Sequence, residues 1–439
     1  MEKEKNQKII LFLSTLRSTA KECDYTCPDK SVVKGTQTND APVKYLLKKY
    51  PNVSEILCLV TNAAKETAWD NFKKVVADTG SKAKCVEIKF EEGAPVQKIL
   101  PDILTKTNGI DEILLEVTGG FRDTMMHLLL ISRALSYKGI ETPCAVYSSL
   151  QSHEVKDVTE ILQVFDLIDG MQNLTSFGNV RKLRNYYDDR PHDDKITALL
   201  DAVDKLWQSI TLCRSNLVPE QITAFNQALR DAKECSDPLL KALLPAFQKK
   251  FGEKMTIPSL IRWCAESDMI QQALTLYRER IPAYIMNERP DILTVDSDAS
   301  PINLKSKAYK KFRFKYEWEA RFHVHFLNMV NWENNSEDQE EEDYSVVLEK
   351  FEEAIENSEF STEYTPERLR AIAMDFMYIH ALRNMVNHAD EQTLGKSTEK
   401  IDYLVKMGYK DPNNFINVED IKNAIIDAVK RLEPQPQNS

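Results

Sequence analysis

The sequence lacks the features that mark several large protein classes. No apolar run comes near the ~18 residues that cross a bilayer, and the N-terminus, MEKEKNQKII, shows neither an apolar signal core nor a small-residue cleavage site. We therefore expect a cytoplasmic protein that does not contact a membrane. The turn after the first apolar run, STLRSTA, contains no glycine, whereas a dinucleotide dehydrogenase needs G-x-G-x-x-G at that turn. A nucleotide-dependent oxidoreductase is therefore disfavoured.

Paired cysteines and a basic charge balance are also missing. The eight cysteines stand singly in apolar or mixed contexts, which is typical of buried thiols in a reducing compartment. Only Cys23 and Cys27 are close, and no second pair completes the four ligands of a structural zinc, so we expect no metal. The formal charge of −11 disfavours a protein that coats DNA by bulk charge. We expect no stable DNA binding.

The first 180 residues alternate strand and helix patterns. Continuous apolar runs of about four to eight residues are typical of strands that are buried on both faces. Their alternation with helix-length stretches predicts an α/β domain with a parallel, doubly wound, Rossmann-like sheet, which binds ligands beyond the carboxyl ends of its strands. The predicted strands are 8–13, 55–60, 84–90, 112–117 and 142–147, and the predicted helices are 41–49, 65–79, 95–105 and 123–136.

After about residue 180 the strand pattern fades and apolar residues recur at helical spacing. We predict an all-α connector followed by a C-terminal α-helical domain. The longest helix should begin with Thr365 as N-cap and Pro366 at its first position. The predicted helices are 193–214, 219–233, 238–250, 259–266, 267–285, 345–356, 366–387 and 418–432.

The first motif that could carry chemistry is T-G-G-F-R, which lies between a predicted strand and a predicted helix. Two glycines at such a turn let backbone N–H groups approach a ligand, and the helix N-terminus adds a positive partial charge. Neighbouring strand ends add hydroxyls, amides, an aromatic ring and a second arginine. A tight turn without a ligand would have the same sequence. The candidate ligand-binding residues are Ser14, Thr15, Arg17, Thr61, Asn62, Thr118, Gly119, Gly120, Phe121, Arg122 and Tyr147.

The second motif, R-N-M-V-N-H, ends the longest predicted helix. Residues four apart share a helix face, so Arg383 stands over Asn387, and Asn384 stands over His388. Such a set suffices for RNA cleavage without metal, because an imidazole moves protons near neutral pH and a guanidinium stabilises charge on the scissile phosphate. A capped helix C-terminus is the alternative, since these residue types are common there. His380 is expected to be a satisfied core histidine rather than a second catalyst.

Together the two motifs resemble a known protein family. The T-G-G-F-R turn inside a doubly wound domain resembles the motif of CRISPR-associated Rossmann-fold (CARF) sensor domains, and R-N-M-V-N-H resembles the R-N-x-x-N-H form of the HEPN ribonuclease motif. In this order the chain is similar to the CARF-HEPN accessory ribonucleases of type III CRISPR systems, which are prokaryotic. The resemblance implies a CARF sensor domain over residues 1–180, a helical connector over 181–300 and a HEPN ribonuclease domain over 301–439.

The resemblance also implies a mechanism. Two CARF domains of a homodimer would hold one cyclic oligoadenylate, and the two HEPN motifs would form one composite site that cuts single-stranded RNA. His388 would be the general acid/base, Arg383 the phosphate stabiliser, and Asn384 and Asn387 the positioning groups. Cleavage would be endonucleolytic and metal-independent, and it would leave a 2′,3′-cyclic phosphate. We expect no cofactor other than the activator, cyclic tetra-adenylate, with cyclic hexa-adenylate as the alternative.

Relatives often carry Asp or Asn and His around the glycine turn, whereas this chain has Glu116 and Thr118. Ligand size and cleavage of the ligand by the sensor domain therefore stay open. A ligand-sensing protein whose helical half binds a partner or nucleic acid without cutting it is the alternative function.

One further segment, residues 305–315 (KSKAYKKFRFK), interleaves basic and aromatic side chains. That pattern suits single-stranded RNA, in which bases stack and phosphates pair with cations. A solvated amphipathic strand or helix would have the same pattern. The acidic run at 334–343 is expected to be solvated. The candidate RNA-binding residues are Lys310, Lys311, Arg313 and Lys315.

Overall fold

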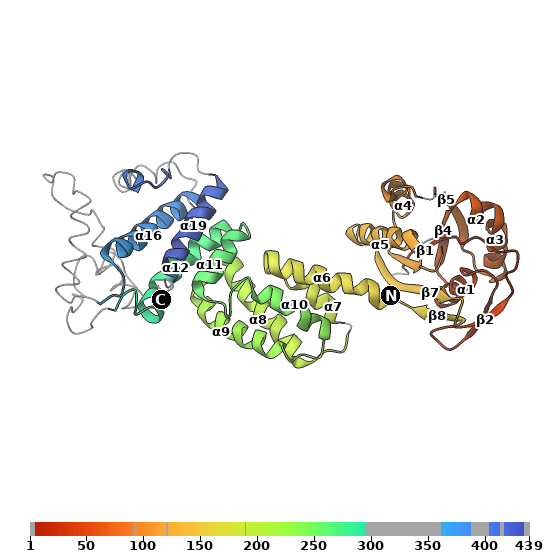
Figure 1. The fold of residues 1–439 in the computed structure, drawn as a ribbon, viewed down its shortest axis with the longest axis horizontal. Helices are drawn as coiled ribbons and strands as arrows, with labels where there is room; N and C mark the ends of the chain where they lie inside the picture. The colour runs from red at the N-terminus through yellow and green to blue at the C-terminus, as the bar shows by residue number, and fades with distance from the viewer. Residues whose placement is uncertain are drawn as a thin grey trace. The chain divides into compact units, whose positions relative to one another are not determined.

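The computed structural model describes residues 5–91, 93–119, 122–188, 190–294, 361–387, 404–412 and 417–433, except for the side chains of residues 122–124. The chain divides into two compact units, Met1–Ile168 and Asp169–Ser439 (Figure 1). The boundary falls within α6 (Thr159–Phe177). No helix in the described part of the chain combines the length and the apolar character needed to cross a membrane.

The N-terminal unit is built on an eight-stranded sheet with the order β3-β2-β8-β7-β6-β1-β4-β5. Five parallel neighbours within it correspond to the five apolar runs of the sequence, so the predicted α/β fold is confirmed. From the central strand β1 the chain adds β4 and β5 on one side, and later β6 and β7 on the other. The order therefore reverses beside β1. The five strands are β1 (Gln7–Phe12), β4 (Val53–Val60), β5 (Lys84–Lys89), β6 (Glu112–Glu116) and β7 (Glu141–Ser149).

Three short strands extend this parallel sheet into a mixed one. β8 pairs with β7 in antiparallel orientation, β2 continues from β8 in parallel, and β3 closes the edge in antiparallel orientation. Each has four residues, most of them exposed or half-buried, so they carry no continuous apolar run that sequence periodicity could detect. These strands are β2 (Cys23–Thr26), β3 (Val32–Gly35) and β8 (Glu154–Asp157).

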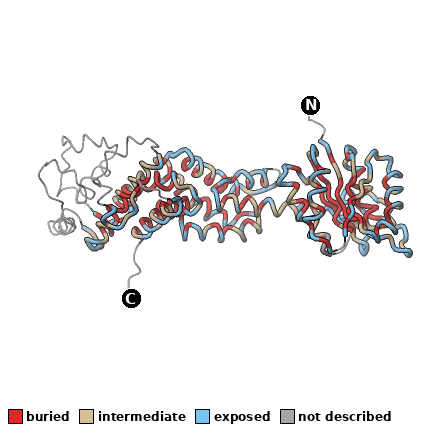
Figure 2. Tube along the Cα trace, turned by 90° about the horizontal axis from the view of Figure 1, so that it is seen from above, coloured by how far each residue is buried: buried red, intermediate tan, exposed pale blue. Residues whose placement is uncertain are grey.

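Helices cover both faces of the sheet. Alternate residues of β1 belong to different cores: Ile9 and Leu11 pack with Leu46 and Phe72 of α1 and α3, whereas Ile10 and Phe12 pack with residues of α4 and α5. Figure 2 shows the strands as the buried centre of the unit. The helices are α1 (Asp40–Lys49), α2 (Asn62–Thr67), α3 (Trp69–Asp78), the short 3₁₀ turn η1 (Val96–Lys98), α4 (Leu100–Lys106) and α5 (Arg122–Tyr137).

The regular elements described in the second unit are helices, as predicted, and an isolated antiparallel bridge joins Thr294 to Ser361. Seven of the eight helices predicted there are present, and the predicted helix 345–356 lies outside the described residues. The elements are α7 (Arg181–Asp188), α8 (Asp194–Thr211), η2 (Ser215–Leu217), α9 (Val218–Ala232), α10 (Pro238–Gln248), α11 (Ile257–Glu266), α12 (Ile270–Glu288), α16 (Pro366–Asn387) and α19 (Val418–Leu432).

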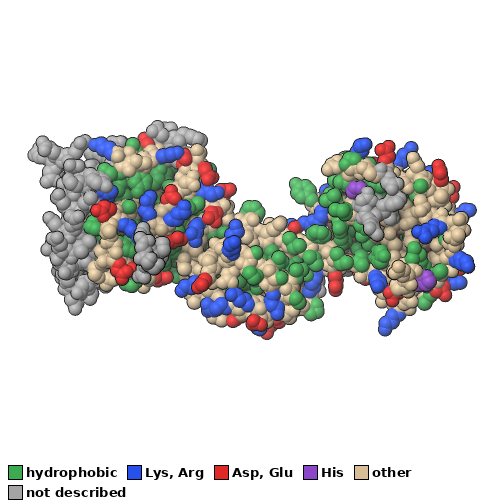
Figure 3. Space-filling model, in the orientation of Figure 1, with side chains coloured by type: hydrophobic (Ala, Val, Ile, Leu, Met, Phe, Trp, Pro, Cys, Tyr) green, Lys and Arg blue, Asp and Glu red, His purple; other side chains and the backbone are tan. Residues whose placement is uncertain are grey.

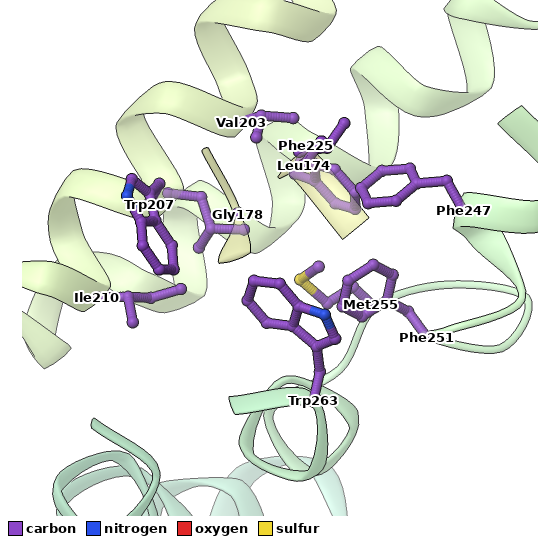
Figure 4. Close-up of a pocket in the computed structure, with 11 residues that line it drawn as sticks. Leu174, Gly178, Val203, Trp207, Ile210, Phe225, Phe247, Phe251, Met255 and Trp263 are labelled. Carbon is purple, nitrogen blue, oxygen red and sulfur yellow. The ribbon is translucent and has the colours of Figure 1, made fainter. Parts of the chain in front are cut away.

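The first helices of this unit enclose an aromatic core. Aromatic side chains from α8, α9, α10 with the turn after it, and α11 surround a cavity of about 20 Å³ (Figure 4). They are Trp207, Phe225, Phe247, Phe251 and Trp263. The lining of the cavity is apolar and its volume is scarcely that of one water molecule, so it is a packing gap rather than a ligand site. Gly178 is required beside it, because its φ is +66° and an added Cβ would lie 2.3 Å from the Trp207 ring.

The long helix α16 packs against α12 and α19, and α11 packs against α19. Thr365 caps α16 as predicted, accepting a hydrogen bond from Arg368 N at 3.4 Å. The buried guanidinium of Arg289, just after α12, pairs with Asp291 and also donates to the Leu432 carbonyl at the end of α19. These contacts hold the three helices together and fix the position of α16 within this unit.

Candidate functional site

The candidate ligand-binding residues gather at the carboxyl ends of four adjacent strands. Ser14 follows β1 and Thr118 follows β6, which are the two neighbours at the point where the strand order reverses. Thr61 follows β4, and Tyr147 lies near the end of β7. Doubly wound sheets bind ligands at this point. We refer to the set of predicted ligand-binding residues as the ligand rim.

Gly119 packs directly on the central strand. A Cβ at this position would lie 1.8 Å from the Phe12 carbonyl oxygen and 2.7 Å from Asn39 Nδ2. The backbone of β1 therefore already excludes any side chain at this position, whether or not a ligand approaches the turn as the sequence suggests. Gly120, Phe121 and the Arg122 side chain lie outside the described residues, although α5 begins at Arg122 as expected.

Asn39 organises the loop after β1. Its Nδ2 donates to the Phe12 carbonyl at 3.0 Å and to Glu116, while its Oδ1 accepts from the Ser14 backbone N–H at 2.9 Å. Gln37 donates to the Ser14 carbonyl. The Thr38 hydroxyl lies 2.8 Å from the Ser14 hydroxyl. The segment before α1 therefore holds both the backbone and the side chain of one ligand-rim residue.

Glu116 is a fully buried carboxyl group at the end of β6. It accepts hydrogen bonds from Asn39 Nδ2 and, at 2.8 Å, from the Thr118 backbone N–H. Burial raises its pKa from 4.5 to about 7, although both of these hydrogen bonds favour the charged form. The carboxyl group therefore titrates near neutral pH, directly behind the glycine turn.

The glycine turn is also fixed to β7. Thr118 Oγ1 accepts from the Ser148 backbone N–H at 2.6 Å, and the Val117 N–H donates to Val146 at 2.9 Å. Successive side chains of a strand point to opposite faces, so the 41% exposed ring of Tyr147 and the buried Ser148 side chain lie on different faces.

The remaining ligand-rim residues are less constrained. The Thr61 hydroxyl caps α2 by accepting from Ala64 N at 3.2 Å, so its lone pair is engaged within the helix. Thr15, Arg17 and Asn62 are exposed. The structure thus links Ser14 to Thr118 through two partners that bond to each other, because Asn39 accepts from the Ser14 N–H and donates to Glu116, which accepts from the Thr118 N–H.

The predicted catalytic residues lie in the last turns of α16. Arg383, Asn384 and Asn387 are half-buried; we call these three residues the polar strip. Arg383 Nε and Asn387 Oδ1 are shielded from solvent, and neither has a hydrogen-bond partner within the described structure. His388 lies outside the described residues, as do the candidate RNA-binding residues Lys310, Lys311, Arg313 and Lys315.

Asn384 of the polar strip is held by a histidine. Arg278 Nε of α12 donates to His380 Nδ1 at 2.8 Å, and the Asn384 amide lies 3.2 Å from His380 Nε2. A neutral imidazole carries its proton on one nitrogen, so Nε2 donates when Nδ1 accepts. Asn384 Nδ2 is the amide atom that faces Nε2, and exchanging the amide oxygen and nitrogen gives the Nε2–H its acceptor. His380 is satisfied as predicted, but its role is to connect α12 to the polar strip.

A second set of contacts secures the opposite side of α16. The buried Asp375 carboxylate accepts from Tyr409 OH at 2.7 Å and from Arg431 Nε of α19 at 2.8 Å. Burial raises the pKa of Asp375 from 3.8 to about 6, against the attraction of Arg431. These contacts to α19 and the contact of His380 with α12 keep the polar strip at a defined orientation within this unit.

This arrangement can bind and polarise a phosphodiester. A guanidinium and an amide one helical turn apart, with a second amide on the adjacent residue, can contact phosphate and ribose oxygens. The described residues include no group of three His, Cys, Asp or Glu side chains that could hold a metal ion. Sequence reasoning missed Asn39, Glu116 and Arg278 as partners of the predicted residues. A glutamate within the apolar run EILLEV was the available signal, because a buried carboxylate requires donors.

Comparisons with known proteins show a structural similarity. No protein family matches the sequence, and no curated protein matches it. The chain is similar to a structure described as Enterococcus italicus Csm6 bound to cyclic hexa-2'-fluoro-hexa-dAMP. The alignment covers 98% of this chain and 93% of that chain, with 12% sequence identity and a TM-score of 0.30. At that TM-score the similarity carries no inference about the present chain.

Proposed function

We propose that the chain is a metal-independent endoribonuclease for single-stranded RNA that is switched on by a cyclic oligoadenylate, and that it acts as a homodimer in type III CRISPR defence. The arrangement at the end of α16 carries this proposal. Arg383 and Asn387 stand one helical turn apart, and each has a buried polar atom that nothing in the described structure satisfies. Because buried polar atoms are nearly always hydrogen-bonded, further groups are expected to complete this strip.

In the proposed reaction, the strips of two protomers converge on one phosphodiester. His388, the residue after Asn387, takes the proton from the ribose 2′-OH or returns one to the leaving 5′-oxygen. The 2′-oxygen then attacks phosphorus, the bond to the 5′-oxygen breaks, and a 2′,3′-cyclic phosphate results. Arg383 stabilises the charge on the phosphate, while Asn384 and Asn387 position the ribose and the imidazole.

The ligand rim is the proposed sensor site. Backbone N–H groups at the T-G-G-F-R turn and the N-terminus of the 16-residue helix α5 favour phosphate oxygens. Arg17 and Arg122 add guanidinium groups, and hydroxyls and amides around the switch point suit ribose and adenine. We infer cyclic tetra-adenylate as the activator, with cyclic hexa-adenylate as the alternative.

An exposed apolar stripe on α5 supports the homodimer. Met126 and Leu130 are 67% and 52% exposed, and Tyr137, one further pair of turns along the same face, is 94% exposed. Figure 3 shows hydrophobic side chains gathered over the part of this unit that carries α5. Because the stripe begins beside the ligand rim, a second copy packed on it would bring the two rims close together.

The first test uses purified full-length protein and labelled single-stranded RNA in EDTA. Cleavage is measured with cyclic tetra-adenylate, with cyclic hexa-adenylate and without ligand. We expect cleavage that depends on one of the rings and leaves 2′,3′-cyclic phosphate ends. Absence of cleavage with both rings would refute the proposal.

The second test separates a nuclease from a binding protein. His388→Ala and Arg383→Ala should each lower cleavage by roughly 100-fold or more while ligand affinity stays unchanged. His192→Ala, which removes an exposed histidine between α7 and α8, is the matched control and should cleave normally. A wild-type protein that binds ligand and RNA but leaves the RNA intact would favour the alternative, a ligand-sensing binding protein.

A further inference from the structure

A single buried pair of side chains joins the segments that carry the ligand rim. Asn39 reaches the end of β1 through Phe12 and the following loop through Ser14, and it reaches the end of β6 through Glu116. Glu116 in turn fixes the Thr118 N–H. Neither side chain is exposed, so neither is placed to contact a ligand at the surface.

The geometry leaves Asn39 one possible orientation. Its Nδ2 faces two oxygens, the Phe12 carbonyl and the Glu116 carboxylate, while its Oδ1 faces the Ser14 N–H. A flipped amide would place oxygen against oxygen twice and nitrogen against nitrogen once. Gly119 packs against the same amide: a Cβ added at this glycine would lie 2.7 Å from Asn39 Nδ2. The Asn39 amide thus connects the end of β1 to the end of β6, the two strands at which the strand order reverses.

We infer that Asn39 and Glu116 are positioning residues for the proposed activator: from behind the ligand rim they fix the backbone at Ser14 and Thr118, and thereby set the affinity of the sensor. This inference rests on the proposed function. A positioning role accounts for polar groups in a place where apolar side chains would fill the space without desolvation cost. The pair contributes defined N–H directions rather than net stability.

One substitution tests each residue of the pair. Glu116→Gln keeps the volume but leaves one acceptor for two N–H donors, so either Asn39 or Thr118 loses its partner. Asn39→Ala leaves the Ser14 N–H and the Phe12 carbonyl without their shared partner. Glu112→Gln is the matched control, because Glu112 is buried on the same strand, accepts from Gln7 Nε2 and lies at the opposite, amino end.

The measurement separates activator affinity from catalytic capacity. RNA cleavage by full-length variants is titrated with cyclic tetra-adenylate and cyclic hexa-adenylate, and circular dichroism checks the fold. We expect Glu116→Gln and Asn39→Ala to raise the half-activating concentration by roughly tenfold or more, the effect of about one lost hydrogen bond. The rate at saturating ligand should fall less than that. Glu112→Gln should stay within about twofold of wild type.

Three results would overturn the inference: an unchanged half-activating concentration in both variants, an equal loss in Glu112→Gln, or a fall confined to the saturated rate. If the wild-type protein responds to neither ring, the proposed function fails, and hydrogen exchange then decides the inference. Faster amide exchange at Ser14 and Thr118 in the two variants, but not in Glu112→Gln, would support positioning of the ligand rim. Unchanged exchange there would refute it.

Discussion

Glu116→Gln should stabilise the N-terminal unit at alkaline pH while it impairs the response to ligand. The wild-type carboxyl group is fully buried, and burial raises its pKa from 4.5 to about 7. A raised pKa means that the folded protein binds the proton more tightly than the unfolded chain does. The contribution of Glu116 to stability is therefore fully present below about pH 4.5, and it is lost as the pH rises through about 7.

The magnitude follows from the pKa difference. At about 1.4 kcal/mol for each pKa unit, a rise from 4.5 to about 7 corresponds to about 3 kcal/mol in the free energy of unfolding. Glutamine does not titrate, and it resembles the protonated carboxyl group in having one donor and one acceptor site. The two proteins should therefore match at about pH 4, and the variant should be more stable by about 2–3 kcal/mol at about pH 8.5.

Native-state hydrogen exchange along β6 gives this difference for the unit that contains the substitution. Groups shared by both proteins cancel in the comparison, and the neighbouring Cys58 thiol stays neutral because burial raises its pKa well above 9.0. The prediction fails if the difference in unfolding free energy between the two proteins does not change with pH, or if the wild type is the more stable protein at about pH 8.5. Either result would show that burial does not raise the pKa of Glu116.

Three further substitutions probe other contacts. Gly119→Ala should destabilise the N-terminal unit by about 3 kcal/mol, measured by thermal unfolding, because the new methyl group overlaps a β1 carbonyl; a loss below about 1 kcal/mol would contradict the packing. Arg278→Met should lower RNA cleavage by roughly tenfold without weakening ligand binding, because His380 loses its donor, and unchanged cleavage would remove it from the site. Leu130→Glu should shift the protein to monomers in light scattering, whereas the control Val32→Glu, at a residue that is 63% exposed, should not; a persistent dimer would place the interface elsewhere.

The strands that build the sheet were predictable because both of their faces are buried. β1 and β6 show this as continuous apolar runs, and every buried residue in such a run is apolar unless it has a partner. β2, β3 and β8 were not predicted, because each has four residues of which only one is buried, and so short a segment shows no periodic pattern. The sheet is therefore mixed at one end, where the sequence indicated parallel strands only.

The sequence alone could identify the residues of the candidate site, but not the contacts between distant positions that hold them. T-G-G-F-R and R-N-M-V-N-H are local patterns, so sequence alone places them at a strand end and on a helix face. The bond between Asn39 and Glu116 joins positions 77 residues apart, and the bond between Arg278 and His380 joins positions 102 apart. No periodicity connects such positions, because their proximity depends on the order of strands and on helix packing.

The separation between the buried Asn39–Glu116 pair and the exposed residues of the ligand rim would make the proposed sensor adaptable. Thr15, Arg17 and Asn62 face solvent, so mutation can exchange them one at a time without disturbing the amide and carboxyl group beneath. Asn39 and Glu116, by contrast, can be substituted only together, because each side chain is the other's buried partner. Laboratory evolution toward a different signalling nucleotide should accordingly accumulate changes at the outer three positions while the inner two stay constant.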